Sequence, residues 1–328
     1  MQLLARTIRG IESLVGEEIR ESGAVRRTRH REVWFDSPRL PHLRTADDVL
    51  RVVTVLPEVG AGRQALVRLA RAVAAIDLDG VDASEGIDVS ASFLGRRAYN
   101  RYDLEDAVGG ALAGRLRVPY HSRRGGVAPP PGTRAWRLTV EGEEAVLALR
   151  PGERPAHRRP YKVGTVPGTL HPPLAAAMAR LAGPVGTVLD PCCGAGTTLI
   201  EAHALNPRAR YVGVDHRYEA VRVAAANGPG VAAWLTGDAG RLPLPGGSVD
   251  RVLVNPPWGR QVGAAGLLRA DRGALWREIA RVLAPGGRVV ALLHEDEWHG
   301  MVVERSFAVS LAGLHPTLAV LRSRRSGA

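Results

Sequence analysis

The residues best suited to chemistry stand together in one short run, Asn255-Pro256-Pro257-Trp258. The run follows an apolar segment at 251–254 that we predict to be a buried strand, and two prolines cannot continue the ladder of a sheet. The chain must therefore leave the sheet here, carrying an amide side chain, a backbone carbonyl and a flat aromatic ring. The side-chain oxygen of Asn255 and the carbonyl of Pro256 could accept both N–H bonds of an exocyclic amine on a nucleobase, while Trp258 stacks on the base. Such an amine is a poor nucleophile, so alignment of its lone pair toward an electrophilic methyl group would supply most of the acceleration.

A second stretch, at 190–198, has the sequence Asp-Pro-Cys-Cys-Gly-Ala-Gly-Thr-Thr. Gly194 and Gly196 let the backbone turn tightly and approach a ligand closely. Residues 197–202 have the pattern of a helix start, so the turn leads from a strand directly into a helix. We interpret this turn as the loop that holds a nucleotide-like cofactor.

Polar residues end four consecutive predicted strands in the second half of the chain. In parallel doubly wound sheets, ligands bind beyond the carboxyl ends of the strands, at the topological switch point. Taken singly, an aspartate at a strand end is often only a helix cap, and an Asn-Pro pair is often only a turn. Four such positions in register favour one shared pocket instead. The four positions are Asp190, Asp215, Asp238 with Ala239, and Asn255.

The acidic residues distinguish between two nucleotide cofactors. The nicotinamide fingerprint Gly-x-Gly-x-x-Gly needs a third glycine, which this loop lacks, so an oxidoreductase is the least favoured class. S-adenosylmethionine carries an ammonium and a sulfonium and fits all three acidic positions. Asp190 would lie near its amino-acid end, Asp215 on the ribose hydroxyls and Asp238 near the adenine amine. The predicted cofactor-binding residues are Asp190, Cys192, Gly194, Gly196, Thr197, Asp215, Asp238, Ala239 and Asn255.

The elements that must position these residues alternate between strand and helix. Short, nearly continuous apolar strands between helices predict a parallel, doubly wound α/β sheet. The predicted strands cover 187–190, 211–215, 231–235, 249–254 and 288–293, the helices cover 172–181, 197–205, 218–227 and 274–283, and a hairpin at 307–314 and 318–322 closes the chain.

The first half of the chain has a different order of elements. Between the halves, proline, glycine, arginine and histidine without an apolar period predict a linker. We therefore expect a first region at 1–155, a linker at 156–170 and a second domain at 171–328. In the first region the predicted strands cover 3–7, 25–35 as a pair, 87–93, 136–140 and 145–149, the helices cover 10–22, 64–75 and 103–116, and 47–55 stays open between strand and helix.

The chain of 328 residues has a net charge of +11 and a pI near 10.7. A general arginine bias accounts for part of this charge, but the excess over 33 acidic residues favours a polyanionic partner. Nucleic acid is favoured over a membrane, because no apolar run could span a bilayer and no basic amphipathic helix stands out. Cys192 and Cys193 are adjacent and leave no disulfide framework or zinc cluster, and the start of the chain lacks a signal peptide, which predicts a cytoplasmic protein.

Residues 171–328 resemble the class I S-adenosylmethionine-dependent methyltransferases. The run that begins at Asp190 is similar to the first motif of that family, and Asn255-Pro-Pro-Trp is similar to its amino-methylating signature. Two further runs, His157-Arg-Arg-Pro-Tyr and Leu174-Ala-Ala-Ala-Met, extend the resemblance to the tRNA and rRNA guanine-N2 methyltransferases that carry a THUMP domain.

This resemblance implies a Rossmann-like methyltransferase domain behind an N-terminal α+β region, ferredoxin-like and then THUMP-like, that binds RNA. It implies methyl transfer from S-adenosylmethionine to the N2 amine of a guanosine in RNA, with tRNA as the favoured substrate. We further expect a monomer that needs no metal. Cys192 stands where the family usually has a bulkier residue, and Trp258 where Tyr or Phe is commoner, so the exact substrate stays open. The family's catalytic set maps onto Asn255, Pro256, Pro257 and Trp258.

Several alternatives remain open from the residues alone. A pair of acceptors for an amine would serve adenine N6 in DNA or rRNA as well as guanine N2. An RNA-binding protein without activity is a further alternative, although the intact strand-end residues argue against it. His294 and His299 suggest a zinc helix, but they are one place too far apart for His-Glu-x-x-His. The arginines that could contact RNA, or form solvated ion pairs instead, lie at 26–31, 96–97, 123–124 and 158–159.

Overall fold

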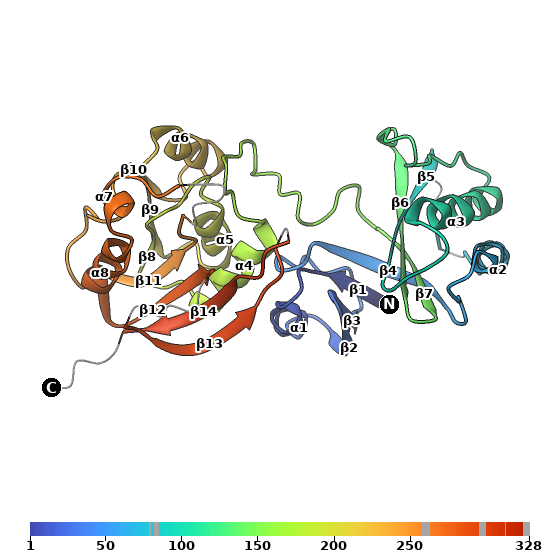
Figure 1. Ribbon diagram of the computed structural model, residues 1–328, viewed down its shortest axis with the longest axis horizontal. Helices are drawn as coiled ribbons and strands as arrows, with labels where there is room; N and C mark the ends of the chain where they lie inside the picture. Colours follow the sequence, from blue (N-terminus) through green and yellow to red (C-terminus); the bar gives the residue numbers. More distant parts are fainter. Residues whose placement is uncertain (79, 82–84, 258–262, 295–299, 312, 324–328) are drawn as a thin grey trace.

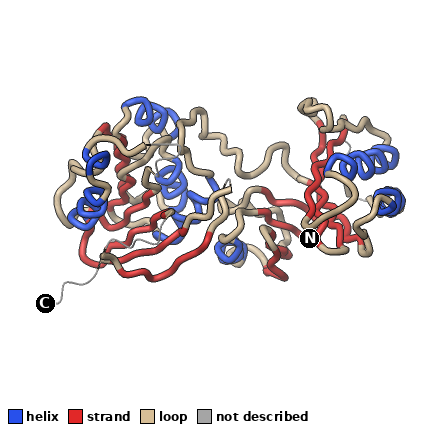
Figure 2. Tube along the Cα trace, in the orientation of Figure 1, coloured by secondary structure: helices blue, strands red, loops and turns tan. Residues whose placement is uncertain are grey.

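The computed structural model describes residues 1–328 except 79, 82–84, 258–262, 295–299, 312 and 324–328. Two seven-stranded sheets with their helices form two lobes along the length of the molecule (Figure 1). A long loop at 150–171 runs from one lobe to the other (Figure 2). We call the part before this loop the N-terminal half and the part after it the C-terminal half. In the described part of the chain, no helix is both long and apolar enough to cross a membrane.

The C-terminal sheet is the doubly wound sheet that the sequence predicts. Its strands are β8 (Thr187–Asp190), β9 (Arg210–Asp215), β10 (Ala233–Thr236), β11 (Val249–Val254), β12 (Leu283–Leu293), β13 (Val302–Ala308) and β14 (Thr317–Arg322). Their order is β10-β9-β8-β11-β12-β14-β13; the first five strands are parallel, and β14 is antiparallel to both of its neighbours, β12 and β13. Because the strand order changes direction between β8 and β11, the topological switch point lies there.

Helices cover both faces of the C-terminal sheet. They are α4 (Pro172–Ala182), α5 (Thr197–Leu205), α6 (Tyr218–Asn227), α7 (Leu267–Ala270) and α8 (Gly273–Val282). Alternate residues of a strand face opposite sides, so Val290 of β12 packs with α4 while Val289 packs with α8. Proline in the first turn of α4 and Gly183 at φ +59° after its last turn define its ends.

The closing hairpin differs from the prediction in its first strand. β13 covers Val302–Ala308, several residues before the predicted 307–314. It is the edge strand of the sheet, and its middle carries Glu304 and Arg305, so the alternation that marks a half-buried strand is absent. The short helix α7 was not predicted either, because four residues carry too little periodicity.

The N-terminal half has the α+β organisation that we expected. Its strands are β1 (Gln2–Arg6), β2 (Ala24–Arg29), β3 (Glu32–Asp36), β4 (Asp48–Leu56), β5 (Gly86–Phe93), β6 (Thr133–Glu141) and β7 (Glu144–Leu149), in the order β2-β3-β1-β4-β7-β6-β5. The open segment at 47–55 is therefore a strand. Its first residues pair with β1 and its later ones with β7. Strand β4 therefore joins the strands β1 to β3 and the strands β5 to β7 into one sheet. The helices are α1 (Glu12–Ile19), which packs on β2 and β3, α3 (Arg101–Leu116), which packs on β5, and α2 (Gln64–Ala74), which packs on α3.

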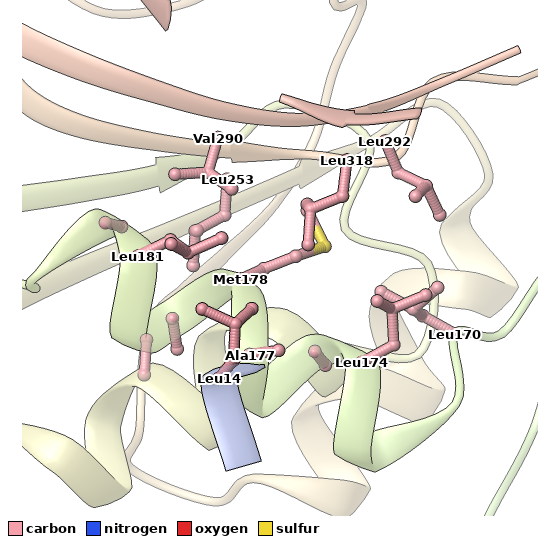
Figure 3. Close-up of a cluster of buried hydrophobic side chains, with 14 of the residues drawn as sticks. Leu14, Leu170, Leu174, Ala177, Met178, Leu181, Leu253, Val290, Leu292 and Leu318 are labelled. Atoms are coloured by element: carbon pink, nitrogen blue, oxygen red, sulfur yellow. The ribbon is translucent and has the colours of Figure 1, made fainter. Parts of the chain in front are cut away.

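The two halves share a hydrophobic core. Ile8, Ile11 and Leu14 of the N-terminal half are buried in the same cluster as Leu174 and Met178 of α4. Figure 3 shows Leu14 reaching the face of α4 that lies opposite the C-terminal sheet. Helix α4 is therefore enclosed between the sheet on one side and α1 on the other, and the N-terminal half covers apolar surface that would otherwise be exposed.

Candidate functional site

A cavity of about 320 Å³ opens beyond the carboxyl ends of β8, β9, β10 and β11, at the switch point of the sheet. This volume is in the range of small-molecule sites. Gly196 does not line the cavity, and Trp258 lies outside the described residues. The predicted residues that do line it are Asp190, Cys192, Gly194, Thr197, Asp215, Asp238, Ala239, Asn255, Pro256 and Pro257.

The glycine loop turns from β8 into α5 through two left-handed residues, Gly194 at φ +51° and Gly196 at φ +78°. The amide of Gly194 donates to Asp215 Oδ2 at 2.9 Å, so this glycine lies against the cavity wall. A Cβ at Gly196 would come within 2.7 Å of the Trp234 ring and 3.1 Å of Ala224 Cβ. The structure thus gives Gly196 a packing reason for being glycine, away from the cavity.

Asp190 ends β8 and is 1% exposed. Its Oδ1 accepts from the Cys192 amide at 2.9 Å, and its Oδ2 accepts a short hydrogen bond from the Thr198 hydroxyl. Burial raises the pKa of the Asp190 carboxyl to about 7, because desolvation outweighs these hydrogen bonds. A cation in the cavity would restore the charged form, since an opposite charge nearby favours ionisation.

Asp215 and Asp238 also use part of their acceptor capacity on the backbone. Asp215 Oδ1 accepts from the Arg217 amide at 2.9 Å, and the Arg217 side chain lies 3.6 Å away. Asp238 Oδ1 accepts from the Gly240 amide and Oδ2 from the Leu267 amide, both at 2.8 Å. An ionised carboxylate has about four lone-pair sites, so each of these side chains can still accept hydrogen bonds from a ligand.

Asn255 directly follows β11 and lines the cavity. Its side-chain oxygen Oδ1 is buried and has no hydrogen-bond partner among the described residues. Thr197 Oγ1, at the first residue of α5, is buried and unpartnered in the same way. Buried polar atoms are nearly always hydrogen-bonded in native proteins, so these two atoms mark places where a ligand would complete the structure.

Several residues of the cavity were missed by the sequence reasoning. Residues 167–171 belong to the segment that we assigned mainly to a linker, yet they form one wall, and His216, Arg217, Leu311 and Leu314 form others. These are loop residues without periodicity, and only their chain position beside a predicted strand end or helix start could have marked them. Arg159 was a candidate for RNA contact, but it is 6% exposed and paired with Glu201 at 2.9 Å.

The two cysteines lie in the glycine loop as free thiols, and both line the cavity, Cys192 half-buried and Cys193 buried. Burial is the main cause that raises the pKa of both thiols, so both stay protonated and unreactive at neutral pH. Among the residues that the structure describes, no group of three His, Cys, Asp or Glu side chains could hold a metal ion. The segment at 294–299 is described only at His294, so the suggested zinc helix lies outside the described residues.

Comparisons with known proteins agree with this geometry. Residues 159–310 match the family model UPF0020, described as an RMKL-like methyltransferase domain. A tRNA (guanine(6)-N2)-methyltransferase of Thermus thermophilus is 34% identical over 271 residues, which cover 77% of each chain. A U6 snRNA (guanine-N(2))-methyltransferase of Bos taurus, THUMPD2, is 37% identical over 134 residues, which cover 38% of this chain and 25% of that one.

Solved structures extend the likeness to the whole chain. The crystal structure of TrmN from Thermus thermophilus covers 98% of this chain and 99% of its own, at 28% identity and a TM-score of 0.79. The crystal structure of SMU.472, solved in complex with SAH, covers 99% of this chain and 99% of its own, at 16% identity and a TM-score of 0.74. The second likeness concerns the fold alone, and both structures span the N-terminal as well as the C-terminal half.

Proposed function

The chain belongs to the family of THUMP-domain, S-adenosylmethionine-dependent RNA guanine-N2 methyltransferases, and we propose that it methylates the exocyclic N2 amine of a guanosine in tRNA. Family membership assigns the reaction class and the cofactor. The choice of tRNA rests on the Thermus thermophilus relative, which is a tRNA methyltransferase and matches 77% of this chain. The roles of single residues below belong to the proposal.

One observation carries the proposed chemistry, the buried and unpartnered Oδ1 of Asn255 on the cavity wall. This oxygen would accept one N–H bond of the target amine, and the backbone carbonyl of Pro256 would accept the other. The two acceptors would hold the amine so that its lone pair points into the cavity. Such alignment counts for most of the rate, since methyl transfer needs no acid for its leaving group.

The residues of the cavity fit S-adenosylmethionine, whose sulfonium supplies an electrophilic methyl group when it is bound. Asp190 would receive the ammonium of the amino-acid end, a role supported by its burial and by its lack of a cationic partner among the described residues. Asp215 and Asp238 would accept hydrogen bonds from the ribose hydroxyls and from the adenine amine. Thr197 Oγ1 is a further buried group without a partner on the same wall.

We propose that the N-terminal half supplies most of the RNA affinity through phosphate contacts. Of the arginines that we considered, Arg96 of the N-terminal half and Arg158 of the loop that follows it are exposed, and the described part of the chain pairs neither with a carboxylate. Others are already engaged, such as Arg26 with Asp36 at 2.6 Å. Free guanidinium groups are the better candidates for phosphate, because they need not give up an ion pair to bind it.

The proposed function is tested by incubating purified full-length protein with unmodified tRNA and S-adenosylmethionine, and by analysing the digested nucleosides by mass spectrometry. We expect N2-methylguanosine. The appearance of N6-methyladenosine would replace guanine by adenine as the target, and RNA binding without any methylated nucleoside would support the inactive RNA-binding alternative. A cavity variant, Asp215→Ala, serves as the control for contaminating activity.

A further inference from the structure

Residues 44–47, which we call the bridging segment, connect the N-terminal half to two walls of the cavity. Arg44 Nε donates to Glu201 Oε2 at 2.7 Å, and His171 Nε2 lies 2.7 Å from Asp47 Oδ1. Glu201 belongs to α5, the helix whose first residues line the cavity, and His171 lines the cavity itself. Two side chains, three positions apart, therefore contact both the helix that follows the glycine loop and a lining residue of the cavity.

The contact at Glu201 is a buried charge cluster. Glu201 is fully buried, and its Oε1 accepts from Arg159 Nε at 2.9 Å and from the Tyr161 hydroxyl at 2.8 Å, while Oε2 accepts from Arg44. Arg159 also donates to the backbone carbonyl of Arg44. A buried carboxylate with partners on both oxygens holds its surroundings in one arrangement, and the loss of one partner leaves charge poorly compensated.

The bridging segment is held just as firmly inside the N-terminal half. Glu18 of α1 is 6% exposed, and it accepts from the backbone amides of Arg44 and Thr45, both at 2.9 Å, and from the Thr45 hydroxyl. The Thr7 hydroxyl donates to the Thr45 carbonyl at 3.0 Å. Because the segment is anchored on both sides, the position of the N-terminal half is transmitted directly to α5 and to His171.

His171 is the N-cap residue of α4, its side chain is 30% exposed, and it lines the cavity. Its Nε2 is engaged by Asp47, so the orientation of the ring at the cavity wall depends on this contact. An imidazole without Asp47 would be free to rotate, and a ligand would then have to order it on binding. Asp47 thus fixes a polar group of the cavity from the other half of the molecule.

We propose that Arg44 and Asp47 are positioning residues of the cofactor cavity. The N-terminal half then has two roles, because it binds the RNA and also preorganises the cofactor site. This inference rests on the proposed function. If the two halves were independent domains, the C-terminal half alone would form the cofactor site. The cofactor site is complete only when the bridging segment holds Glu201 and His171 in place.

The test measures the affinity of S-adenosylhomocysteine for the full-length protein by calorimetry, in the absence of RNA. We expect Arg44→Met and Asp47→Ala to weaken binding about tenfold each, since a ligand must then order the walls itself. Asp47→Asn still presents an oxygen to His171 and should recover most of the loss. The matched control is Glu17→Ala, which breaks an exposed ion pair between the halves, Arg305 Nη2 to Glu17 Oε1 at 3.1 Å, and should bind within about twofold of the parent protein.

Melting temperatures of the same samples separate positioning from a general loss of stability. The proposal is supported if affinity falls in well-folded Arg44→Met and Asp47→Ala and returns in Asp47→Asn. It is overturned if both variants bind like the parent, or if affinity simply follows the melting temperature across all variants, the control included. A parent protein that binds no S-adenosylhomocysteine would overturn the proposed function itself, which is a different and recognisable result.

Discussion

The two halves of the molecule use charged side chains in opposite ways. In the C-terminal half, Asp190, Asp215 and Asp238 follow neighbouring parallel strands and meet at one cavity with Asn255. In the N-terminal half, charges are spread over strands and loops, and many arginines are already paired, as Arg29 is with Glu144 at 2.6 Å. A position at the end of a parallel strand therefore predicts what a side chain does, whereas a count of positive charges does not predict which of them is free.

The largest expected effect is at Asn255, which tests whether the strand-end residues of the C-terminal half carry the chemistry. Asn255→Ala removes the unpartnered acceptor, and we expect the single-turnover methylation rate to fall about 100-fold or more, because a misplaced reactant loses most of the benefit of orientation. Affinity for S-adenosylhomocysteine should stay close to that of the parent, since Asp190, Asp215 and Asp238 remain.

Asn255→Asp is the finer variant at this position. A carboxylate still accepts an N–H bond, so this protein should retain more activity than Asn255→Ala. If Asn255 served only to form the turn before Pro256, both variants would lose melting temperature, cofactor affinity and activity together. Near-parental turnover by a well-folded Asn255→Ala protein would remove this residue from the mechanism.

A second, smaller effect concerns pH and Asp190. Its pKa is raised to about 7 in the unliganded protein, and a bound ammonium favours the ionised form. Cofactor affinity should therefore weaken as pH falls below about 7, by roughly tenfold per pH unit at most. The stability of the protein without cofactor should change in the opposite direction and increase as pH falls. A carboxyl whose folded pKa is raised lowers the free energy of unfolding as pH rises from about 4 to about 7.

Calorimetry between pH 5.5 and pH 8 (about one to two units around this pKa) checks this prediction, with melting curves of the unliganded protein at the same pH values. Two histidines, His171 and His216, also line the cavity. Asp190→Asn distinguishes them from Asp190, since it should bind weakly at every pH and show a flatter profile. A profile as steep as that of the parent in Asp190→Asn would assign the pH dependence to the histidines.

The smallest expected effect concerns which arginines bind RNA. Arg158→Ala and Arg96→Ala should each reduce the slope of log affinity for tRNA against log salt by about 0.7 to 0.9, which corresponds to one phosphate contact. Arg26→Ala, which removes an arginine paired with Asp36, should change the slope less. Equal changes at all three positions would mean that ion pairing inside the protein does not decide which arginines bind RNA.

The doubly wound sheet and most of the cavity could be predicted from the sequence for a physical reason. Parallel strands bury both faces, so each appears in the sequence as a continuous apolar run. A glycine loop or an Asn-Pro-Pro run ends such a strand, and ligands bind beyond the carboxyl ends of the strands. The helix bounds at 197–205 and 218–227 agree with α5 and α6 because each helix directly follows such a strand end.

What the sequence did not predict depends on contacts between distant segments. Nothing local marks Arg44 or Asp47 as neighbours of the cavity, because their partners Glu201 and His171 lie more than a hundred positions further along the chain. Arg159 lies in a segment whose composition is typical of a solvated linker, and only the fold shows that it forms an ion pair with a buried carboxylate. The wall at 167–171 follows no periodicity, so it could not be separated from the linker before it.

The central claim is that the methyl group goes to the 2-amino group of a guanosine, and one substrate tests it directly. Once the methylated position is mapped in a tRNA, that guanosine is replaced by inosine, which differs only by the absence of this amine. The account predicts full methylation of the guanosine RNA and none of the inosine RNA, with similar binding of both. Methylation of the inosine RNA at the same nucleotide would contradict it, because the acceptor would then be a ring nitrogen or the ribose.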